Sequence, residues 1–176
     1  MSDLDRLEKL VGRQRPAHQS IDWDVIEHGL DLRLPSDYKA YLAAFPPGAF
    51  QDELITVTHP AASPSAEAFV TEMNEFCREI EETKDSLEVN GTYRMRPTQG
   101  GLLPWGFVGE DLVLCWETAS PPEQWNSVIA TPYFDDVWSY PKGMLATLID
   151  LISGSTGIDS LSFIAGEPNF VKRTGY

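Results

Sequence analysis

The sequence predicts an α+β domain in which helices from the N- and C-terminal parts pack against a twisted, mostly antiparallel sheet of about four to six strands. Three observations predict this fold class. The stretch Gly100–Trp116 places two apolar runs on either side of the tight bend Gly109-Glu110-Asp111, as in a hairpin. Helical periodicity recurs before and after this stretch. With 176 residues, 42% of them hydrophobic, the chain suffices for one domain, 1–176, with an ordinary core.

Short helices are expected in the N-terminal part. A capping-box pattern at residues 2–5 begins the first, and a connector at 13–19 follows it. The second begins at position 20 or 22 and has Gly29 just beyond its end. The third has Ser36 as its N-cap and stops at Pro46-Pro47-Gly48. A short strand at 54–58 comes next.

The clearest helical pattern begins at Ser63-Pro64 and continues to residue 83. Apolar residues recur on one face at spacings of three and four, namely Ala66, Phe69, Val70, Met73, Phe76, Cys77 and Ile80. The other face carries Glu67, Glu72, Glu75, Glu79 and Glu82. The apolar stripe is typical of a core-facing helix. We expect the glutamates to face solvent, with a basic partner as the alternative.

The C-terminal part predicts two strands, a helix and a tail. The strands are expected at 127–131 and 133–139, and the second contains Asp135 and Asp136. A helix capped by Ser139 or Tyr140 then ends at Gly154. In the tail, 155–176, the apolar run 161–165 is a candidate edge strand.

Charge restricts the kinds of partner. The chain has 13 basic and 27 acidic residues, which gives a net charge of −14. A nucleic-acid binder needs a basic footprint to displace counterions from phosphates, so we expect no nucleic-acid partner. The acidity favours either simple solubility or attraction to a basic protein.

The cysteines and the apolar runs indicate the compartment. Cys77 and Cys115 lie far apart within apolar patterns, which predicts two buried thiols and a cytoplasmic location. The N-terminal residues lack an apolar signal core, and no run reaches the roughly 18 apolar residues of a membrane span. We therefore expect no membrane association.

Catalytic and metal-binding patterns are not found in the sequence. The three histidines, His18, His28 and His59, are scattered, and there is no HExxH, CxxC or GxSxG motif. Asp135 and Asp136 are adjacent on a predicted strand, so their side chains would point to opposite faces, which disfavours a shared metal and favours a turn or surface role. We expect no enzyme activity, metal or cofactor, although a site assembled by the fold stays an alternative.

Aromatic and acidic residues alternate in and around the predicted sheet. Four tryptophans lie in or beside the predicted sheet, namely Trp105, Trp116, Trp125 and Trp138, and two or three of them are expected to fill the core. Tryptophans are also enriched at the centres of protein interfaces, and carboxylates at the rim steer a basic partner. The candidate partner-binding residues are Trp105, Glu110, Asp111, Glu117, Asp135, Asp136 and Trp138.

Two segments resemble the SUKH superfamily, which includes fungal cell-wall-assembly regulators and bacterial immunity proteins. Leu34–Lys39, followed by Phe45 and Gly48, resembles the "LP-x-D-Y … F … G" helix of that superfamily. Leu103–Gly106 and Gly109–Glu117 are similar to its hairpin, in which an LP-aromatic step precedes a Gly-acidic turn. The resemblance covers about residues 20–154.

The chain also departs from the superfamily pattern. Pro46-Pro47 replaces the usual polar loop residues, and Cys115-Trp116-Glu117 replaces a small acidic pattern. The long helix at 63–83 stands as an insertion.

The resemblance implies an α+β domain without shared catalytic residues. It also implies, from the bacterial members, an antidote that binds and blocks a cognate toxin, often a nuclease. The leading hypothesis is therefore an immunity-type inhibitor of a basic, nuclease-like toxin. The alternatives are a scaffold or regulatory interaction domain and, third, a small enzyme with a fold-assembled site. The sequence does not predict an oligomeric state.

Overall fold

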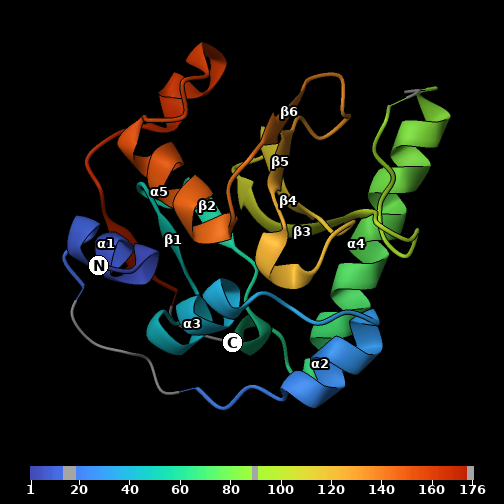
Figure 1. Ribbon diagram of the computed structural model, residues 1–176, viewed down its shortest axis with the longest axis horizontal. Coiled ribbons are helices and arrows are strands. Elements are labelled where there is room, and N and C mark those ends of the chain that lie inside the picture. Colours follow the sequence, from blue (N-terminus) through green and yellow to red (C-terminus); the bar gives the residue numbers. More distant parts are fainter. Residues whose placement is uncertain (14–18, 89–90, 174–176) are drawn as a thin grey trace.

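A single seven-stranded antiparallel sheet lies between two layers of helices in the computed structural model (Figure 1). The structure describes residues 1–13, 19–88 and 91–173. The strands, in chain order, are β1 (Gly48–Phe50), β2 (Ile55–Val57), β3 (Leu102–Val108), β4 (Leu112–Glu117), β5 (Ser127–Ala130), β6 (Val137–Tyr140) and β7 (Phe170–Lys172). Their spatial order is β6-β5-β4-β3-β2-β1-β7. The predicted α+β class is confirmed, and the sheet has more strands than expected.

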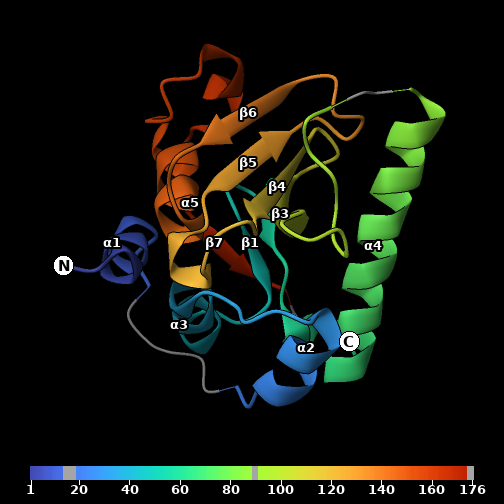
Figure 2. The ribbon, with the colours of Figure 1, turned by 45° about the vertical axis from the view of Figure 1, so that its right-hand side comes forward.

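One long helix covers one face of the sheet, and a group of shorter helices covers the other (Figure 2). The α-helices are α1 (Asp3–Leu10), α2 (Trp23–Leu30), α3 (Ser36–Ala44), α4 (Ala66–Ser86) and α5 (Met144–Ser153). Short 3-10 turns occur at η1 (Pro60–Ala62), η2 (Pro122–Gln124) and η3 (Asp159–Ile164). α4 covers one face and packs against α2, whereas α5 packs with α1 and α3 on the opposite face.

The hairpin β3–β4 stands at the centre of the sheet, as predicted. Val108 pairs with Leu112, and Gly109 takes the left-handed conformation (φ 52°) that this tight bend needs. Nearly every residue of both strands is buried. Strands buried on both faces have continuous apolar sequences, which explains why the two runs lack polar alternation.

Aromatic contacts fix α3 to the hairpin. The ring of Tyr38 lies edge-on to Trp116 with centroids 4.9 Å apart, and its hydroxyl donates to the backbone oxygen of Thr58 at 2.6 Å. Both residues are almost fully buried. The helix α3, which begins within the segment 34–39 at Ser36, is therefore held against the sheet by its inner face.

The start of α3 is capped from a distant loop. The predicted N-cap, Ser36, is instead the first helical residue, and its backbone N–H and hydroxyl both donate to the carboxylate of Glu123, at 2.8 and 2.6 Å. The neighbouring Asp37 accepts from the backbone N–H of Leu145 in the first turn of α5 (3.4 Å). A carboxylate suits both positions because helix N-termini carry unpaired donors.

Several predicted boundaries in the C-terminal part are wrong. The strand expected at 133–139 is shorter, because 131–136 form a turn before β6. The helix expected from position 140 begins at Met144, since Ser139 and Tyr140 belong to β6. The run 161–165 lies mostly in the 3-10 turn η3, with Leu161 and Ile164 buried. The edge strand of the tail is β7, which pairs with β1.

Two differences occur in the N-terminal part. The turn expected at 46–48 leads directly into β1, a strand that the sequence analysis missed. Gly29 lies inside α2, where a side chain would meet Val70 of α4 at 2.7 Å, so the helices approach closely there. The connector at 13–19 falls mostly outside the described residues, as does Asn90 of the expected turn at 90–91.

The long helix confirms the predicted division of its faces. It begins three residues later than expected, with Ser65 as its N-cap. Phe69, Met73, Cys77 and Ile80 are buried against the sheet, whereas Phe76 is half-buried. All five glutamates of the outer face are exposed, namely Glu67, Glu72, Glu75, Glu79 and Glu82.

Alanine substitutions on α4 test this packing. Phe69→Ala should lower the free energy of unfolding by about 3–5 kcal/mol, because it empties a fully buried site. Phe76→Ala should cost less, about 1–2 kcal/mol, because that ring is already half in solvent. Urea denaturation of both variants measures the two losses. A loss below about 1 kcal/mol for Phe69→Ala would show that the stripe is not core.

Candidate functional site

Two neighbouring turns bring four of the predicted carboxylates to one end of the sheet. In the antiparallel order β3-β4-β5-β6, the turn after β3 and the turn after β5 lie at the same end. Val113 pairs with Ala130, so the two turns begin beside each other. Two strand spacings place their centres about 10 Å apart. We call Glu110, Asp111, Asp135 and Asp136 the acidic sheet end.

The side chains of the acidic sheet end are open to solvent. All four residues are exposed, and none forms an ion pair with another described residue. Asp135 and Asp136 lie in the turn and not on a strand, so the expected arrangement on opposite faces is wrong. The hydroxyl of Thr131 donates to Asp135, which lowers the pKa of that carboxyl. The carboxyl group of Asp135 is therefore ionised at neutral pH.

The two tryptophans among the candidate residues differ in their exposure. Trp105 is completely buried, so it is withdrawn as a surface anchor. It lies at a register shift of β3, and its indole N–H is buried without a partner among the described residues. Trp138 is half-buried on the edge strand β6, close to the acidic sheet end. Of these two candidates, Trp138 is thus the one that a partner can reach.

Glu117 does not belong to this surface. It pairs with Leu102 at the opposite end of β4, and β4 runs for six residues. At about 3.3 Å per residue, the length of that strand separates Glu117 from the acidic sheet end.

Tyr133 is a surface aromatic that the sequence analysis did not single out. It is 57% exposed and lies two residues before Asp135. The sequence feature that indicates its exposure is the combination of the adjacent Pro132 with the Asp135-Asp136 pair, because these residues favour a turn over a strand. Its neighbour Phe134 is buried and lies 4.8 Å from the ammonium group of Lys84.

Lys84 attaches the turn to α4. Its side chain is buried, and its ammonium group donates to the backbone oxygen of Tyr93. Burial lowers the pKa of Lys84 from its usual value, and Glu81 lies 4.0 Å away. The turn that carries Asp135 and Asp136 is therefore held from behind by a cation–π contact with Phe134.

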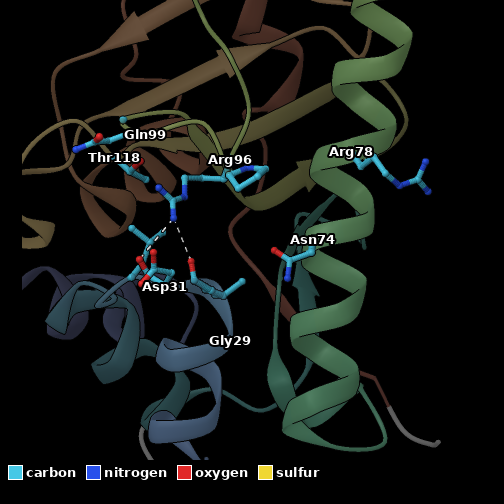
Figure 3. Close-up of a pocket in the computed structure, with 11 residues that line it drawn as sticks. Gly29, Asp31, Asn74, Arg78, Arg96, Gln99 and Thr118 are labelled. Atoms are coloured by element: carbon cyan, nitrogen blue, oxygen red, sulfur yellow. Dashed lines mark hydrogen bonds between the residues drawn. The ribbon is translucent and has the colours of Figure 1, made fainter.

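A cleft lies elsewhere, between the end of α2, α4 and the segment before β3. Its volume is about 960 Å³. Figure 3 shows Arg96 directed toward the end of α2, where it donates to the backbone oxygens of Leu30 (3.2 Å) and Asp31 (3.5 Å). Arg78 points away from the cleft and pairs with Glu82. Both guanidinium groups thus have structural contacts.

The chemistry that lines this cleft is hydrogen-bonding and not nucleophilic. Asn74, Gln99 and Thr118 contribute amide and hydroxyl groups, and Asp31 contributes the one carboxylate among the described lining residues. Both thiols lie outside the cleft. Burial raises the pKa of Cys77 to about 12 and that of Cys115 well above its usual range. Neither is a thiolate at neutral pH.

A smaller apolar groove separates α4 from β2 and β3. It has a volume of about 260 Å³. We call it the α4–β3 groove and define it by its lining residues, Thr56, Val57, Thr58, His59, Ala62, Ser63, Phe69, Glu72, Met73, Phe76 and Phe107. The rings of Phe76 and Phe107 meet edge to face, with centroids 4.9 Å apart. Both are half-buried and form one side of the groove.

His59 is fixed at the base of this groove as a neutral imidazole. Its Nδ1 accepts from the backbone N–H of Ala61 at 3.1 Å, which leaves Nε2 to donate to the backbone oxygen of Phe45 at 2.9 Å. Burial lowers the pKa of His59 to about 4. The histidine therefore joins η1 to the end of α3 and carries no charge at neutral pH.

Metal and membrane signatures were sought in the same part of the chain. Residues 1–13, 19–88 and 91–173 contain no grouping of three or more His, Cys, Asp or Glu side chains that could hold a metal ion. Across the same ranges, no helix combines the length and apolar character required for a membrane crossing.

Comparisons with known proteins leave the resemblance untested. No protein-family model matches the chain, and no match is found among curated proteins or solved structures. The fold and surface together define an α+β protein with an acidic sheet end. Membership of the SUKH superfamily stays a prediction.

The lowered pKa of His59 makes the free energy of unfolding depend on pH. Its value is about 4 in the fold and 6.5 in an unfolded chain, so the unfolded state binds the proton more tightly between these values. The stabilisation is complete above pH 6.5 and decreases as the pH falls toward 4. Between pH 7 and pH 5 the loss should be about 2 kcal/mol.

His59→Gln isolates this effect, because its amide can still donate to Phe45 but does not titrate. Urea denaturation at both pH values should show the loss in the unaltered protein and little of it in the variant. Equal losses in both proteins would assign the pH dependence to other groups.

Proposed function

We propose that this protein is a non-enzymatic, immunity-type inhibitor that binds a basic, nuclease-like toxin through the acidic sheet end. The observation that carries the proposal is the gathering of four exposed carboxylates, without ion pairs among the described residues, on two adjacent turns. A nuclease must be basic to hold its substrate, so an inhibitor with this surface is complementary to it. The SUKH-like segments agree with the same function.

The surface supplies both parts of a protein interface. The carboxylates steer a cationic partner, and they act mainly on the association rate. Tyr133 and the half-buried Trp138 lie beside them and offer ring faces to lysine and arginine side chains. Aromatic anchors of this kind mainly slow dissociation when a partner covers them.

Both cysteines are free and buried, which fits a protein of the reducing cytoplasm. A nuclease toxin would act in the same compartment. We therefore extend the proposal to a cytoplasmic antidote.

The first test is protection of cells. A long open reading frame beside the gene would supply the candidate toxin, and its C-terminal domain would be expressed with and without this protein. Growth should be restored when both are present. Binding without any growth defect from the partner alone would favour a scaffold or regulatory protein.

Surface-plasmon rates then locate the interface. Asp111→Asn with Asp135→Asn should lower the association rate about 3–10-fold at roughly 0.05 M salt, with a much smaller effect at about 0.5 M salt. The matched control is Glu117→Gln with Asp24→Asn. It removes the same number of charges from the other end of β4 and from α2, which lies below the sheet in Figure 2.

Trp138→Ala should instead speed dissociation, by about 30-fold for a loss near 2 kcal/mol. Equal association rates for the test and control pairs at low salt would exclude the acidic sheet end as the binding site.

A further inference from the structure

We infer that the α4–β3 groove is a second docking site, which receives an apolar side chain adjacent to a lysine or arginine of a basic protein partner. The inference rests on the proposed function only in taking the partner to be basic. It adds a specific contact that the charge of the acidic sheet end does not provide.

The shape of the groove fits one side chain. Val57, Phe69 and Met73 are buried and form its floor, whereas Phe76 and Phe107 are half-buried on one side. Its volume, about 260 Å³, is below the range of roughly 300–1,000 Å³ that is typical of drug-sized ligands. The groove therefore accommodates a leucine or aromatic side chain better than a cofactor.

The charge at the rim selects for a cation next to that apolar group. The hydroxyl of Ser63 donates to Glu72 at 2.6 Å and fixes this carboxylate at the edge of the groove. Glu72 and Glu79 lie four residues before and three residues after Phe76, so they share its flank of α4. No lysine or arginine is among the described residues that line the groove.

The remaining polar groups of the groove do not offset this charge. His59 uses both ring nitrogens on backbone groups, and the hydroxyl of Thr58 donates to the backbone oxygen of Trp105. The one arginine on this part of α4, Arg78, pairs with Glu82 and lies two residues from Phe76, which places it about 200° around the helix. An apolar group that carries a negative charge would therefore be repelled.

The groove also lies near the acidic sheet end. Phe107 is three residues before Glu110 on the same hairpin. A single basic partner can thus be steered by the turns and held by a side chain that enters the α4–β3 groove beside Phe76 and Phe107. Burial of an apolar group at that position would complete the covering of two rings that solvent now reaches.

Methionine methyl signals provide a direct test that needs no toxin. The chain has four methionines, of which Met73 lies in the groove, whereas Met95 and Met144 are buried outside it. In protein with ¹³C-labelled methionine methyl groups, titration with benzylammonium should move the Met73 signal saturably and leave the other two unchanged. Methylammonium, which lacks the ring, should have no effect.

Charge selectivity is tested with benzoate, which has the same ring and the opposite charge. It should bind at least about 10-fold more weakly than benzylammonium. Glu72→Gln should weaken benzylammonium binding about 2–5-fold. Glu67→Gln is the matched control, because Glu67 is exposed on the same helix and is not among the residues that line the groove. Unchanged Met95 and Met144 signals would verify that both variants are folded.

An unmoved Met73 signal, or equal binding of benzoate and benzylammonium, would overturn the inference. The two proposals can fail separately. If benzylammonium binds but no toxin does, the docking site in the groove is supported and the proposed antidote function is refuted. If a toxin binds without perturbing the Met73 signal, only the proposed docking site is refuted.

Discussion

Burial of the β3–β4 hairpin on both faces is the constraint on which the rest of this structure depends. Two adjacent apolar strands without polar alternation cannot face water on either side, so each face needs its own cover. α4 supplies one cover through Phe69, Met73 and Cys77, and α3 and α5 supply the other. The distant caps Glu123 and Asp37 then fix the starts of α3 and α5.

The same constraint decides where a partner can bind. The two tryptophans of the hairpin, Trp105 and Trp116, are buried in the core, so a partner cannot contact them. Two surfaces next to the hairpin stay exposed. They are the acidic sheet end, where the turns carry charge, and the α4–β3 groove, where two phenylalanine rings are incompletely covered. In the proposed function, the partner therefore binds at the edges of the sheet and not at its centre. In this arrangement, charge directs encounter and aromatic groups hold the complex.

Local patterns predicted the hairpin and the division of α4 into buried and exposed faces, because both follow from residue spacing alone. Strand pairing was harder to predict. Whether Glu117 shares a surface with Glu110 depends on strand direction, and the edge strand β7 exists only because β1 pairs with it. Trp105 looked like a surface anchor since a sequence cannot show that both faces of a strand are covered. The sequence pattern places 133–136 in a strand, whereas these residues form a turn, and it therefore does not predict the exposure of Tyr133.

Amide hydrogen exchange tests the central position of the hairpin most directly. If both faces of β3–β4 are sealed by helices, the amides of Val113, Leu114 and Cys115 should exchange only when the whole molecule unfolds. Their opening free energies should equal the global free energy of unfolding, whereas Val171 in the edge strand β7 should exchange by local opening. Exchange of the β4 amides at the rate of Val171 would contradict the account, because the hairpin would then be a peripheral element and not the one that organises the fold.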